Sequence, residues 1–504
     1  MQNTFGTSLL IALALSAAPA MAKEPSTASR LANETATARH YASLIAGAEP
    51  KLAELTMFFT QMPKGGDLHH HYSGSIYVEQ YLEFLDKQGL CVNKQTYRIE
   101  LDKALIAAER ARPAKERNCL SSAEVYADDH TWRELAQRWS NKDFSNHGAI
   151  QPPPDRLFFQ TFGYFGPVSN ANFAEGLQTL KKRAIAENVS YIETMFKMAP
   201  AIANPEFDKR AWELQTAGDD AALQLEMRRA MEALERDPAF AKSIADFVAK
   251  IEDAAQGIDD EQFTMRYQTY VLRLLNPSQV FSSMLAAFKS ASSGGKVVGV
   301  NIVGQESTHV SMRDYALHMK MFGFLKSLYP QVKVAMHAGE LALGDVPPEG
   351  LKFHIDQALT VARADRIGHG IDLAHEANAI QIMGKMRADD IPVEINLTSN
   401  SFISGIEGAN HPVTLYRKYG VPYVISTDDA GVTRHTLTQE YVLFASRYKP
   451  DYAEMKKTSY NSVRYAFLSA PEKARLTRQL DTRFAAFEAG MAKLEKAVAS
   501  APRK

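Results

Sequence analysis

The chain has 504 residues, of which 45% are hydrophobic and 23% are charged, and its formal net charge is −1. This is the profile of a globular protein with a sizeable core, in one large domain or in several smaller ones. The balanced charge argues against a nucleic-acid partner, because proteins that bind nucleic acids usually carry a basic excess.

The first 22 residues have the composition of a secretory signal peptide. The apolar run "TSLLIALALSAAPAMA" ends in the small-x-small sequence Ala20-Met21-Ala22, so we expect cleavage after Ala22. The preceding "MQNTFG" contains no Lys or Arg, which leaves an uncleaved anchor or a buried helix as the alternative. No later segment has an uncharged apolar run of the length that a membrane span needs. We therefore expect an exported protein, periplasmic or secreted, without a membrane span in its mature form.

Two segments near the N-terminus flank the first predicted strand, which is "KGGDLHHH" at 64–71. Residues 23–60 predict an N-terminal helical extension. Residues from about 76 to about 150 contain both cysteines and the loop sequence "NHGAIQPPPD", so they indicate a lobe inserted after that strand. In an oxidising compartment Cys91 and Cys119 could form a disulfide, and two free thiols are the alternative.

Seven further runs predict strands, and most of them lie in the second half of the chain. Their residues are 189–196, 266–275, 296–304, 332–337, 365–370, 392–397 and 422–429. The later runs end about thirty residues apart with helical stretches between them, which is the length of a βαβ unit.

Eight strands with helical crossovers favour an α/β fold of the (β/α)8 TIM-barrel type over an open doubly wound sheet. The sequence also lacks the glycine-rich phosphate loop that an open sheet would more often carry. Residues from about 200 to about 260 are rich in Ala, Glu, Asp and Lys at helical spacing, and they predict a helical hairpin inserted after the second strand. The barrel domain with its insertions is therefore expected to span residues 61–504.

Three consecutive histidines end the first predicted strand. Residues i and i+2 of a strand project from one face, so His69 and His71 can share a ligand while His70 faces the other side. Taken alone, the triplet is equally compatible with a polar surface run.

Further candidate ligands follow the later strands: His337 and Glu340 in "MHAGE", His369 in "GHG", and Asp428 and Asp429 in "STDD". In a (β/α)8 barrel the carboxyl ends of the strands meet at one mouth, so these side chains would become neighbours. Each has an ordinary structural explanation when taken singly, as a hydrogen-bonded core histidine or a helix N-cap. Together they form a set of imidazoles and carboxylates without a thiolate, which suits Zn²⁺ with an open position for water.

Other catalytic signatures are missing from the sequence. There is no GxSxG nucleophile elbow. "HEANA" at 375–379 lacks the second histidine of HExxH, and the PCxxC of cytidine-type zinc deaminases does not occur.

These motifs resemble the adenosine deaminase branch of the metal-dependent amidohydrolase barrels. The resemblance covers most of residues 60–470, with motif order preserved, from "MPKGGDLHHHYSGS" through "VVGVNIVGQE", "HAGE", "RIGHG", "TSN" and "HPVTLYRKYGVPYVISTDD" to "NSVRYAFL". The signal peptide and the cysteine-bearing insertion are similar to the secreted, growth-factor-related subgroup. The resemblance implies zinc-dependent hydrolytic deamination of adenosine or 2′-deoxyadenosine to inosine or 2′-deoxyinosine plus ammonia.

The resemblance also implies a role for each site residue. One zinc ion per chain would be held by His69, His71, His337 and Asp428. Glu340 would protonate the purine at N1, and His369 would act on the attacking hydroxide. Asp429 would accept a hydrogen bond from the region of N7, and the backbone of Gly304 would face N3. Ser73 stands where the cytosolic enzymes have an aspartate that contacts the ribose, so ribose recognition stays open.

Two alternatives remain at this point. One is a related barrel deaminase that acts on another 6-aminopurine, such as a modified adenine, a nucleotide or a free base. The other is a secreted binding or signalling protein with a vestigial barrel, although the intact set of site residues argues against it. The expected partner is a small purine nucleoside, and the resemblance together with the N-terminal helical segment favours a homodimer.

Overall fold

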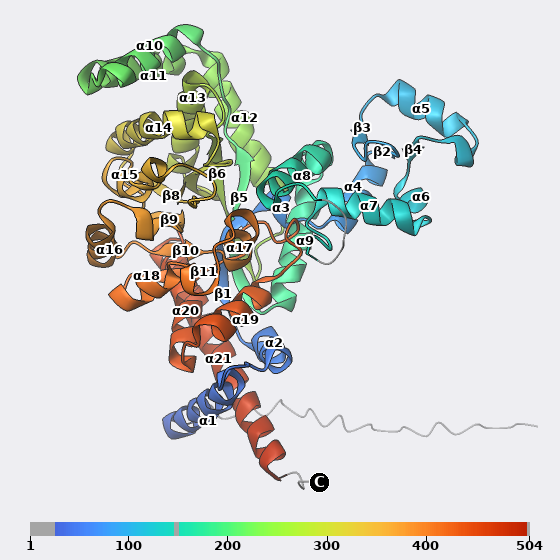
Figure 1. Cartoon of the computed structure of the whole chain (residues 1–504), viewed down its shortest axis with the longest axis vertical. Helices are drawn as coiled ribbons and strands as arrows, with labels where there is room; N and C mark the ends of the chain where they lie inside the picture. Colours follow the sequence, from blue (N-terminus) through green and yellow to red (C-terminus); the bar gives the residue numbers. More distant parts are fainter. Residues whose placement is uncertain (1–25, 146–150, 501–504) are drawn as a thin grey trace, which may run out of the picture.

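The computed structural model describes residues 26–145 and 151–500, and the predicted signal peptide with its cleavage site lies outside these residues. Eight parallel strands form a barrel with helices around it (Figure 1). In hydrogen-bonded order they are β1 (Gly65–His71), β5 (Val189–Met198), β6 (Thr264–Leu272), β7 (Val297–Val303), β8 (Lys333–Ala338), β9 (Arg366–His369), β10 (Val393–Ile395) and β11 (Tyr423–Ile425). A parallel bridge between His70 and Asp428 brings the segment after β11 back beside β1. The predicted (β/α)8 barrel is therefore confirmed.

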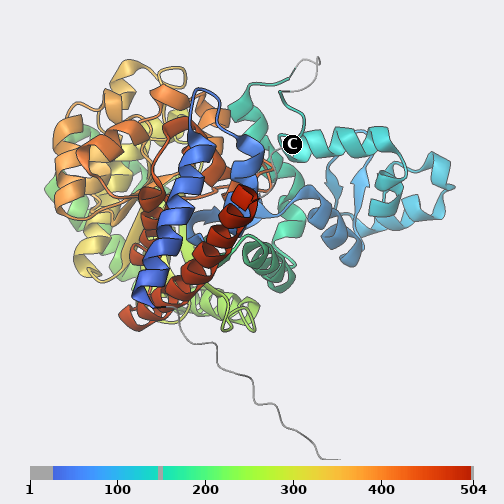
Figure 2. The same ribbon diagram turned by 90° about the horizontal axis from the view of Figure 1, so that it is seen from below.

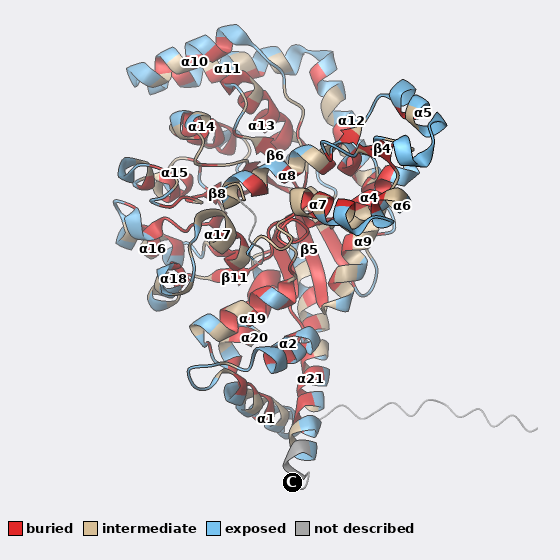
Figure 3. Cartoon of the chain, turned by 45° about the vertical axis from the view of Figure 1, so that its right-hand side comes forward, coloured by how far each residue is buried: buried red, intermediate tan, exposed pale blue. Residues whose placement is uncertain are grey.

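The barrel strands are buried on both faces. The first eight residues of β5 are buried, and β9 and β10 are buried throughout. Parallel sheets need such apolar runs because helices cover the outer face while side chains fill the interior. The main covering helices are α9 (Phe173–Ala186), α13 (Pro277–Ser292), α14 (His309–Leu328), α15 (His354–Thr360), α16 (Ala379–Ala388), α17 (Leu397–Ser404), α18 (Val413–Tyr419), α19 (Leu437–Tyr448) and α20 (Tyr452–Arg464). Figure 3 shows the buried residues along the strands and on the helix faces that meet them.

The N-terminal helical segment packs against the end of the chain. Its helices and their partner are α1 (Thr27–Ile45), α2 (Leu52–Gln61) and α21 (Ala470–Ser500), which lie side by side in Figure 2. The ring of Phe58 lies 5.4 Å from that of Tyr41 and 5.2 Å from that of Phe487, centroid to centroid. This aromatic burial ties the segment to the barrel domain. Neither α21 nor any other described helix is long and apolar enough to cross a membrane.

A segment inserted between β1 and β5 stands out from the barrel (Figure 1). Its first elements are α3 (Tyr72–Ser75), α4 (Val78–Lys87), β2 (Cys91–Asn93), β3 (Ile99–Glu100), α5 (Lys103–Ala111), β4 (Cys119–Leu120), α6 (Ser122–Tyr126) and α7 (Asp129–Trp139). The three strands form a small antiparallel sheet in the order β3-β2-β4. Cys91 and Cys119 form a disulfide between β2 and β4, with their Cα atoms 5.4 Å apart. α8 (Pro154–Ser169) then returns the chain toward the barrel.

The second insertion, between β5 and β6, contains three helices where the sequence predicts a hairpin of two. They are α10 (Pro205–Ala217), α11 (Asp220–Arg236) and α12 (Pro238–Ala254). Gly218 ends α10 in the left-handed conformation, at φ 67°, and Asp219 caps the next helix. Asp237 caps α12, and Pro238 occupies the first position of that helix. The chain is therefore broken between α11 and α12, which makes three helices instead of two.

Candidate active site

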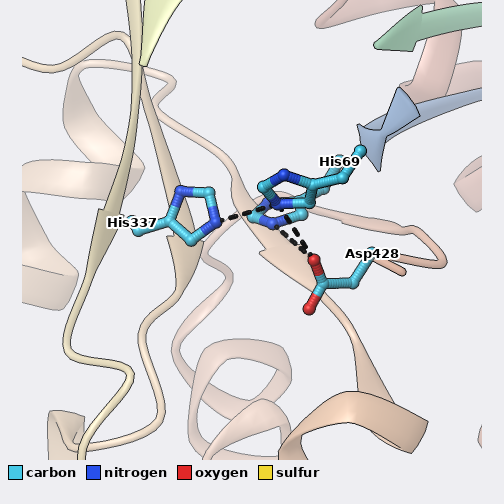
Figure 4. A group of neighbouring side chains, drawn as sticks. His69, His337 and Asp428 are labelled. Atoms are coloured by element: carbon cyan, nitrogen blue, oxygen red, sulfur yellow. Dashed lines mark hydrogen bonds and ion pairs between the residues drawn. The ribbon is translucent and has the colours of Figure 1, made fainter. Parts of the chain in front are cut away.

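The four predicted metal ligands meet at the carboxyl end of the barrel. Figure 4 labels three of them, His69, His337 and Asp428. His69 and His71 come from β1, His337 from β8, and Asp428 from the segment after β11. One ligand atom from each lies within 4.8 Å of the others. Nε2 of His71 lies 3.2 Å from Nε2 of His337 and 3.1 Å from Oδ1 of Asp428. Nε2 of His69 lies 3.4 Å from the same Asp428 oxygen.

The donor set fits a zinc ion. Nε2 of His69 is buried without a hydrogen-bond partner, and two imidazole nitrogens face each other across the centre of the group. A buried nitrogen without a partner is costly unless something accepts its lone pair, and a cation at the centre would do so. Imidazole nitrogens and carboxylate oxygens are ordinary zinc ligands, and catalytic zinc sites keep one position open for water.

Two polar residues within the barrel hold the ligand rings in place. Nδ1 of His69 donates to Oε2 of Glu394 at 2.6 Å, and Nδ1 of His337 donates to Oδ1 of Asn301 at 2.9 Å. These bonds fix the tautomer that leaves each Nε2 free for a metal. Burial raises the pKa of Glu394, but the Arg366 cation and His69 lower it to about 2, so the carboxylate is ionised. Sequence reasoning missed Glu394 and Asn301, although a polar residue inside an apolar predicted strand was a signal that could have found them.

His70 points away from the metal ligands, as strand alternation predicts. Its Nδ1 donates to Oγ1 of Thr194 at 3.0 Å. It lines a separate cavity of about 30 Å³ together with Leu180 and Arg183 of α9. His69 and His71 therefore belong to the candidate metal site, while His70 lies toward the helical layer.

Glu340 and His369 lie beside the four ligands. The ligand atoms of Glu340, His369 and Asp428 are within 4.8 Å of one another, and Nδ1 of His369 lies 3.6 Å from Oε1 of Glu340. Burial raises the pKa of the Glu340 carboxyl well above its usual range, and the charges of Asp428 and Glu306 raise it further. His369 and Asp428 have φ values of 66° and 65°, a conformation that non-glycine residues rarely adopt and that often marks functional sites.

The loop that carries Glu340 is held by a residue that sequence reasoning did not single out. The backbone N–H groups of Gly339 and Glu340 donate to the Glu306 carboxylate at 3.1 and 3.0 Å. Arg273 lies 3.4 Å from Glu306 and donates to the backbone oxygen of His337 at 2.7 Å. A buried ion pair therefore fixes the turn between the metal ligand and Glu340.

A cavity of about 370 Å³ opens beside the site. It is lined by the predicted site residues Ser73, Gly304, His337, Glu340, Asp428 and Asp429, among others. Oδ1 of Asp429 is buried without a partner, and burial together with the Asp428 charge raises the pKa of its carboxyl well above the usual range. The Asp429 carboxylate can lie here because residue 74 is a glycine, and a Cβ on residue 74 would overlap that carboxylate.

One wall of the cavity comes from the first insertion. Phe158, Phe159 and Phe162 of α8 line it, facing apolar residues of β5, β6 and β7. Nε2 of Gln305 donates to Oδ2 of Asp155 at 3.2 Å, which links the start of α8 to the loop after β7. None of the described residues that line this cavity is a lysine or an arginine. Sequence reasoning did not assign α8 to the site.

The chain is similar in sequence to known deaminases. Residues 202–483, more than half of the chain, match a family model described as adenosine deaminase. An adenosine deaminase of Pseudoalteromonas translucida is 28% identical over 258 residues, which cover 47% of this chain and 76% of that protein. An aminodeoxyfutalosine deaminase of Streptomyces coelicolor is 33% identical over 132 residues, and an adenosine deaminase of Pectobacterium atrosepticum is 32% identical over 148 residues. These two alignments cover 26% and 29% of this chain, and only 33% and 41% of the respective relatives.

Solved structures show the same fold. The Arabidopsis ADAL complexed with IMP superimposes with a TM-score of 0.54 at 16% identity, covering 84% of this chain and 98% of that one. The apo N6-methyl-AMP deaminase of Arabidopsis thaliana gives a TM-score of 0.51 at 17% identity, covering 85% and 98%. At such low identity these superpositions establish a shared architecture.

Proposed function

The chain belongs to the adenosine deaminase family, and on that basis we propose that it is a zinc-dependent hydrolase of adenosine and 2′-deoxyadenosine. The reaction replaces the 6-amino group with oxygen, giving inosine or 2′-deoxyinosine and ammonia. The observation that carries the proposal is a buried carboxyl with a strongly raised pKa, Glu340, placed beside a four-ligand metal site.

The metal site would hold one zinc ion through His69, His71, His337 and Asp428. When bound, zinc supplies a water whose pKa is lowered to about 7 and which is therefore a nucleophile at neutral pH. Glu394 and Asn301 orient the histidine rings for this task from the side away from the metal.

Glu340 is the proposed general acid. Attack at C6 of the purine moves electron density onto N1, so a proton donor at N1 stabilises the transition state. A carboxyl can serve only if it is protonated when the substrate binds, and burial near other carboxylates favours that form.

The other site residues have proposed roles in orientation. His369 would orient the attacking hydroxide, because its Nε2 is buried without a partner and lies 4.0 Å from Oδ2 of Asp428. Asp429 would donate a hydrogen bond to N7 of the purine, because its raised pKa favours the protonated carboxyl and its Oδ1 has no protein partner. Gly304 has a φ of 102° and no side chain, so its backbone can approach the ring at N3. Ser73 lines the cavity at the position where the ribose is expected.

The lining of the cavity supports an uncharged substrate. One of the two structural neighbours is complexed with IMP, and the other is an N6-methyl-AMP deaminase. A 5′-phosphate needs a cationic or strongly hydrogen-bonding site, and the described lining residues include no lysine or arginine. An uncharged modified adenine nucleoside or the free base is therefore the second candidate, and a nucleotide is the less favoured one.

We also propose that the protein is exported and belongs to the secreted, growth-factor-related subgroup. The apolar run of residues 7–22 and the Cys91–Cys119 disulfide support export, because stable disulfides are typical of oxidising compartments. The disulfide-bearing insertion after β1 supports the subgroup. Assembly as a homodimer stays a prediction.

The test is turnover by purified protein whose zinc content has been measured. Adenosine, 2′-deoxyadenosine, AMP, N6-methyl-AMP and adenine are supplied in parallel, and the purine absorbance and ammonia release are followed. We expect the two nucleosides to be deaminated fastest. Turnover of AMP alone would contradict the substrate assignment, and no turnover of any aminopurine by the zinc-loaded protein would contradict the proposed function.

A further inference from the structure

A chain of hydrogen bonds runs from a backbone amide to the ring of His369. The N–H of Val413 donates to Nδ1 of His411 at 3.1 Å. Nε2 of His411 lies 3.1 Å from Oδ1 of Asn400, and Nδ2 of Asn400 lies 2.9 Å from Nδ1 of His369. The side chains of Asn400, His411 and His369 are all fully buried.

The backbone amide fixes the direction of every bond in this chain. An N–H group can only donate, so Nδ1 of His411 carries no proton, and the neutral ring must have its proton on Nε2. That proton needs an acceptor, so the oxygen of Asn400 faces His411 and its NH2 group faces His369. Nδ1 of His369 then accepts, which leaves the proton of this ring on Nε2.

This proton faces the metal site. Nε2 of His369 is buried, has no protein partner and lies 4.0 Å from Oδ2 of Asp428. The opposite tautomer would place a proton on Nδ1 against the NH2 group of Asn400. That tautomer would lose a buried hydrogen bond and would place two donors against each other.

We infer that His411 and Asn400 are positioning residues that hold His369 as a hydrogen-bond donor, with its Nε2 proton directed at the attacking oxygen. The inference rests on the proposed function and deepens it. His369 would orient the nucleophile and stabilise negative charge on it, and it would not take up its proton in this state. The family resemblance assigns His369 to the attacking hydroxide without choosing between these roles.

The burial of His411 supports this reading. Burial lowers the pKa of its imidazole to about 3, so the ring is neutral at physiological pH. The relay, meaning the chain of hydrogen bonds from Val413 through His411 and Asn400 to His369, requires this neutral form. A neutral imidazole in this place bridges α17, which carries Asn400, and the start of α18, which carries Val413. The loop between these helices thereby sets the chemistry of a residue on β9.

The first test reads the tautomer directly, in zinc-loaded protein labelled with ¹⁵N-histidine. Signals of His369 and His411 are identified by their loss in His369→Gln and His411→Gln. We expect both rings to be protonated on Nε2 and unprotonated on Nδ1. In Asn400→Asp, whose carboxylate can only accept at this position, Nδ1 of His369 should become protonated. A proton on Nδ1 of His369 in the unsubstituted protein would overturn the inference.

The second test separates positioning from simple packing by kinetics. His411→Phe should lower kcat about tenfold with KM nearly unchanged, since orienting residues behind a site typically contribute 10–100-fold. His411→Gln keeps a donor and should recover part of the loss. Thr414→Val is the matched control, because Thr414 is exposed and its hydroxyl donates to the backbone oxygen of His411 and not to its ring. An unchanged kcat in a zinc-loaded, folded His411→Phe protein would show that the relay serves packing alone.

The two tests also separate this inference from the proposed function. The tautomer measurement needs no substrate, so it remains decisive if no aminopurine is turned over. A proton on Nε2 together with absent turnover would contradict the proposed function and leave the relay in place.

Discussion

Nδ1 of His69 donates a hydrogen bond to Oε2 of Glu394 at 2.6 Å, from the side of the ring opposite the metal site. Glu394 also accepts from Nε of Arg366 at 2.6 Å, and all three side chains are buried. The carboxylate therefore orients a metal ligand while its own charge is balanced by a cation. An ionised carboxylate behind a ligand also makes the imidazole a stronger donor to the metal.

Glu394→Gln should weaken zinc binding by about 10–100-fold, because it removes the charge behind His69 and leaves the ring less firmly oriented. Competition with a chromogenic chelator measures the affinity. Glu495→Gln is the control, since Glu495 pairs with Arg39 at the surface. An unchanged zinc affinity in Glu394→Gln would show that the His69 ring is held by packing alone.

His71 and His70 should respond in opposite ways to substitution. His71→Ala removes a ligand, so we expect less than stoichiometric zinc and the loss of stabilisation by added zinc. His70→Gln should retain one zinc ion per chain, because His70 bonds Thr194 on the other side of β1. Metal analysis and thermal unfolding with and without a chelator make the comparison. Zinc loss from both variants to the same extent would refute the division of the triplet.

Glu340→Gln should keep its zinc and lose activity by about 10²–10⁴-fold in kcat, because an amide has no carboxyl proton to give to N1. Single-turnover kinetics on metal-analysed protein gives the chemical step directly. Glu349→Gln, an exposed neighbour, is expected to behave as the unsubstituted protein. Activity of Glu340→Gln within tenfold of normal would exclude Glu340 as the acid.

Glu376 should make stability depend on pH. Burial raises the pKa of this carboxyl to about 7, although Oε1 accepts from the backbone N–H groups of Ile355 and Asp356. A carboxyl whose pKa is raised by folding stabilises the protein fully below its ordinary value of 4.5. That contribution is lost as the pH rises through about 7, since the buried group must then ionise.

Glu376→Gln keeps an acceptor for both N–H groups and removes the ionisation. We expect its free energy of unfolding to exceed that of the unsubstituted protein by about 2 kcal/mol at pH 8, with little difference at pH 4.5. Urea unfolding at the two pH values measures this, with the exposed Glu261→Gln as control. Equal stability of the two proteins at pH 8 would mean that water reaches the carboxylate.

The Cys91–Cys119 disulfide should stabilise the inserted segment. The two residues are 28 positions apart, and closing a loop of this length contributes about 3.6 kcal/mol in the chain-entropy account. Replacing both cysteines by serine should increase hydrogen exchange in β2, β3 and β4 while zinc content and turnover are kept. A reducing agent should have the same effect on the unsubstituted protein and none on the variant. Loss of zinc on reduction would show that this segment supports the metal site.

The local sequence was sufficient to predict the fold and most of the side chains that lie together at the mouth of the barrel. Short β-rich runs with helical stretches between them identified all eight barrel strands, because a parallel barrel strand is buried on both faces and stands out from helical sequence. Strand alternation separated His69 and His71 from His70. The convergence of strand ends in a barrel then brought His337, His369 and the two aspartates to one mouth.

The tertiary structure alone decided which residues stand behind the candidate metal ligands and which helix forms a wall of the cavity beside them. Glu394, Asn301 and His411 act across strands or helices that are far apart in the sequence, and a hydrogen bond between such residues leaves no spacing to detect. The aromatic wall of α8 is also a matter of docking, since its phenylalanines would suit any buried helix. The sequence by itself determined the barrel and the group of candidate ligands at its strand ends, because runs of strand residues between helical stretches predict a barrel and a barrel brings its strand ends to one mouth. The orientation of the histidine rings, the pKa values of the buried carboxyls and the shape of the cavity were decided by contacts between distant segments, because they depend on distances and burial that only the folded chain defines.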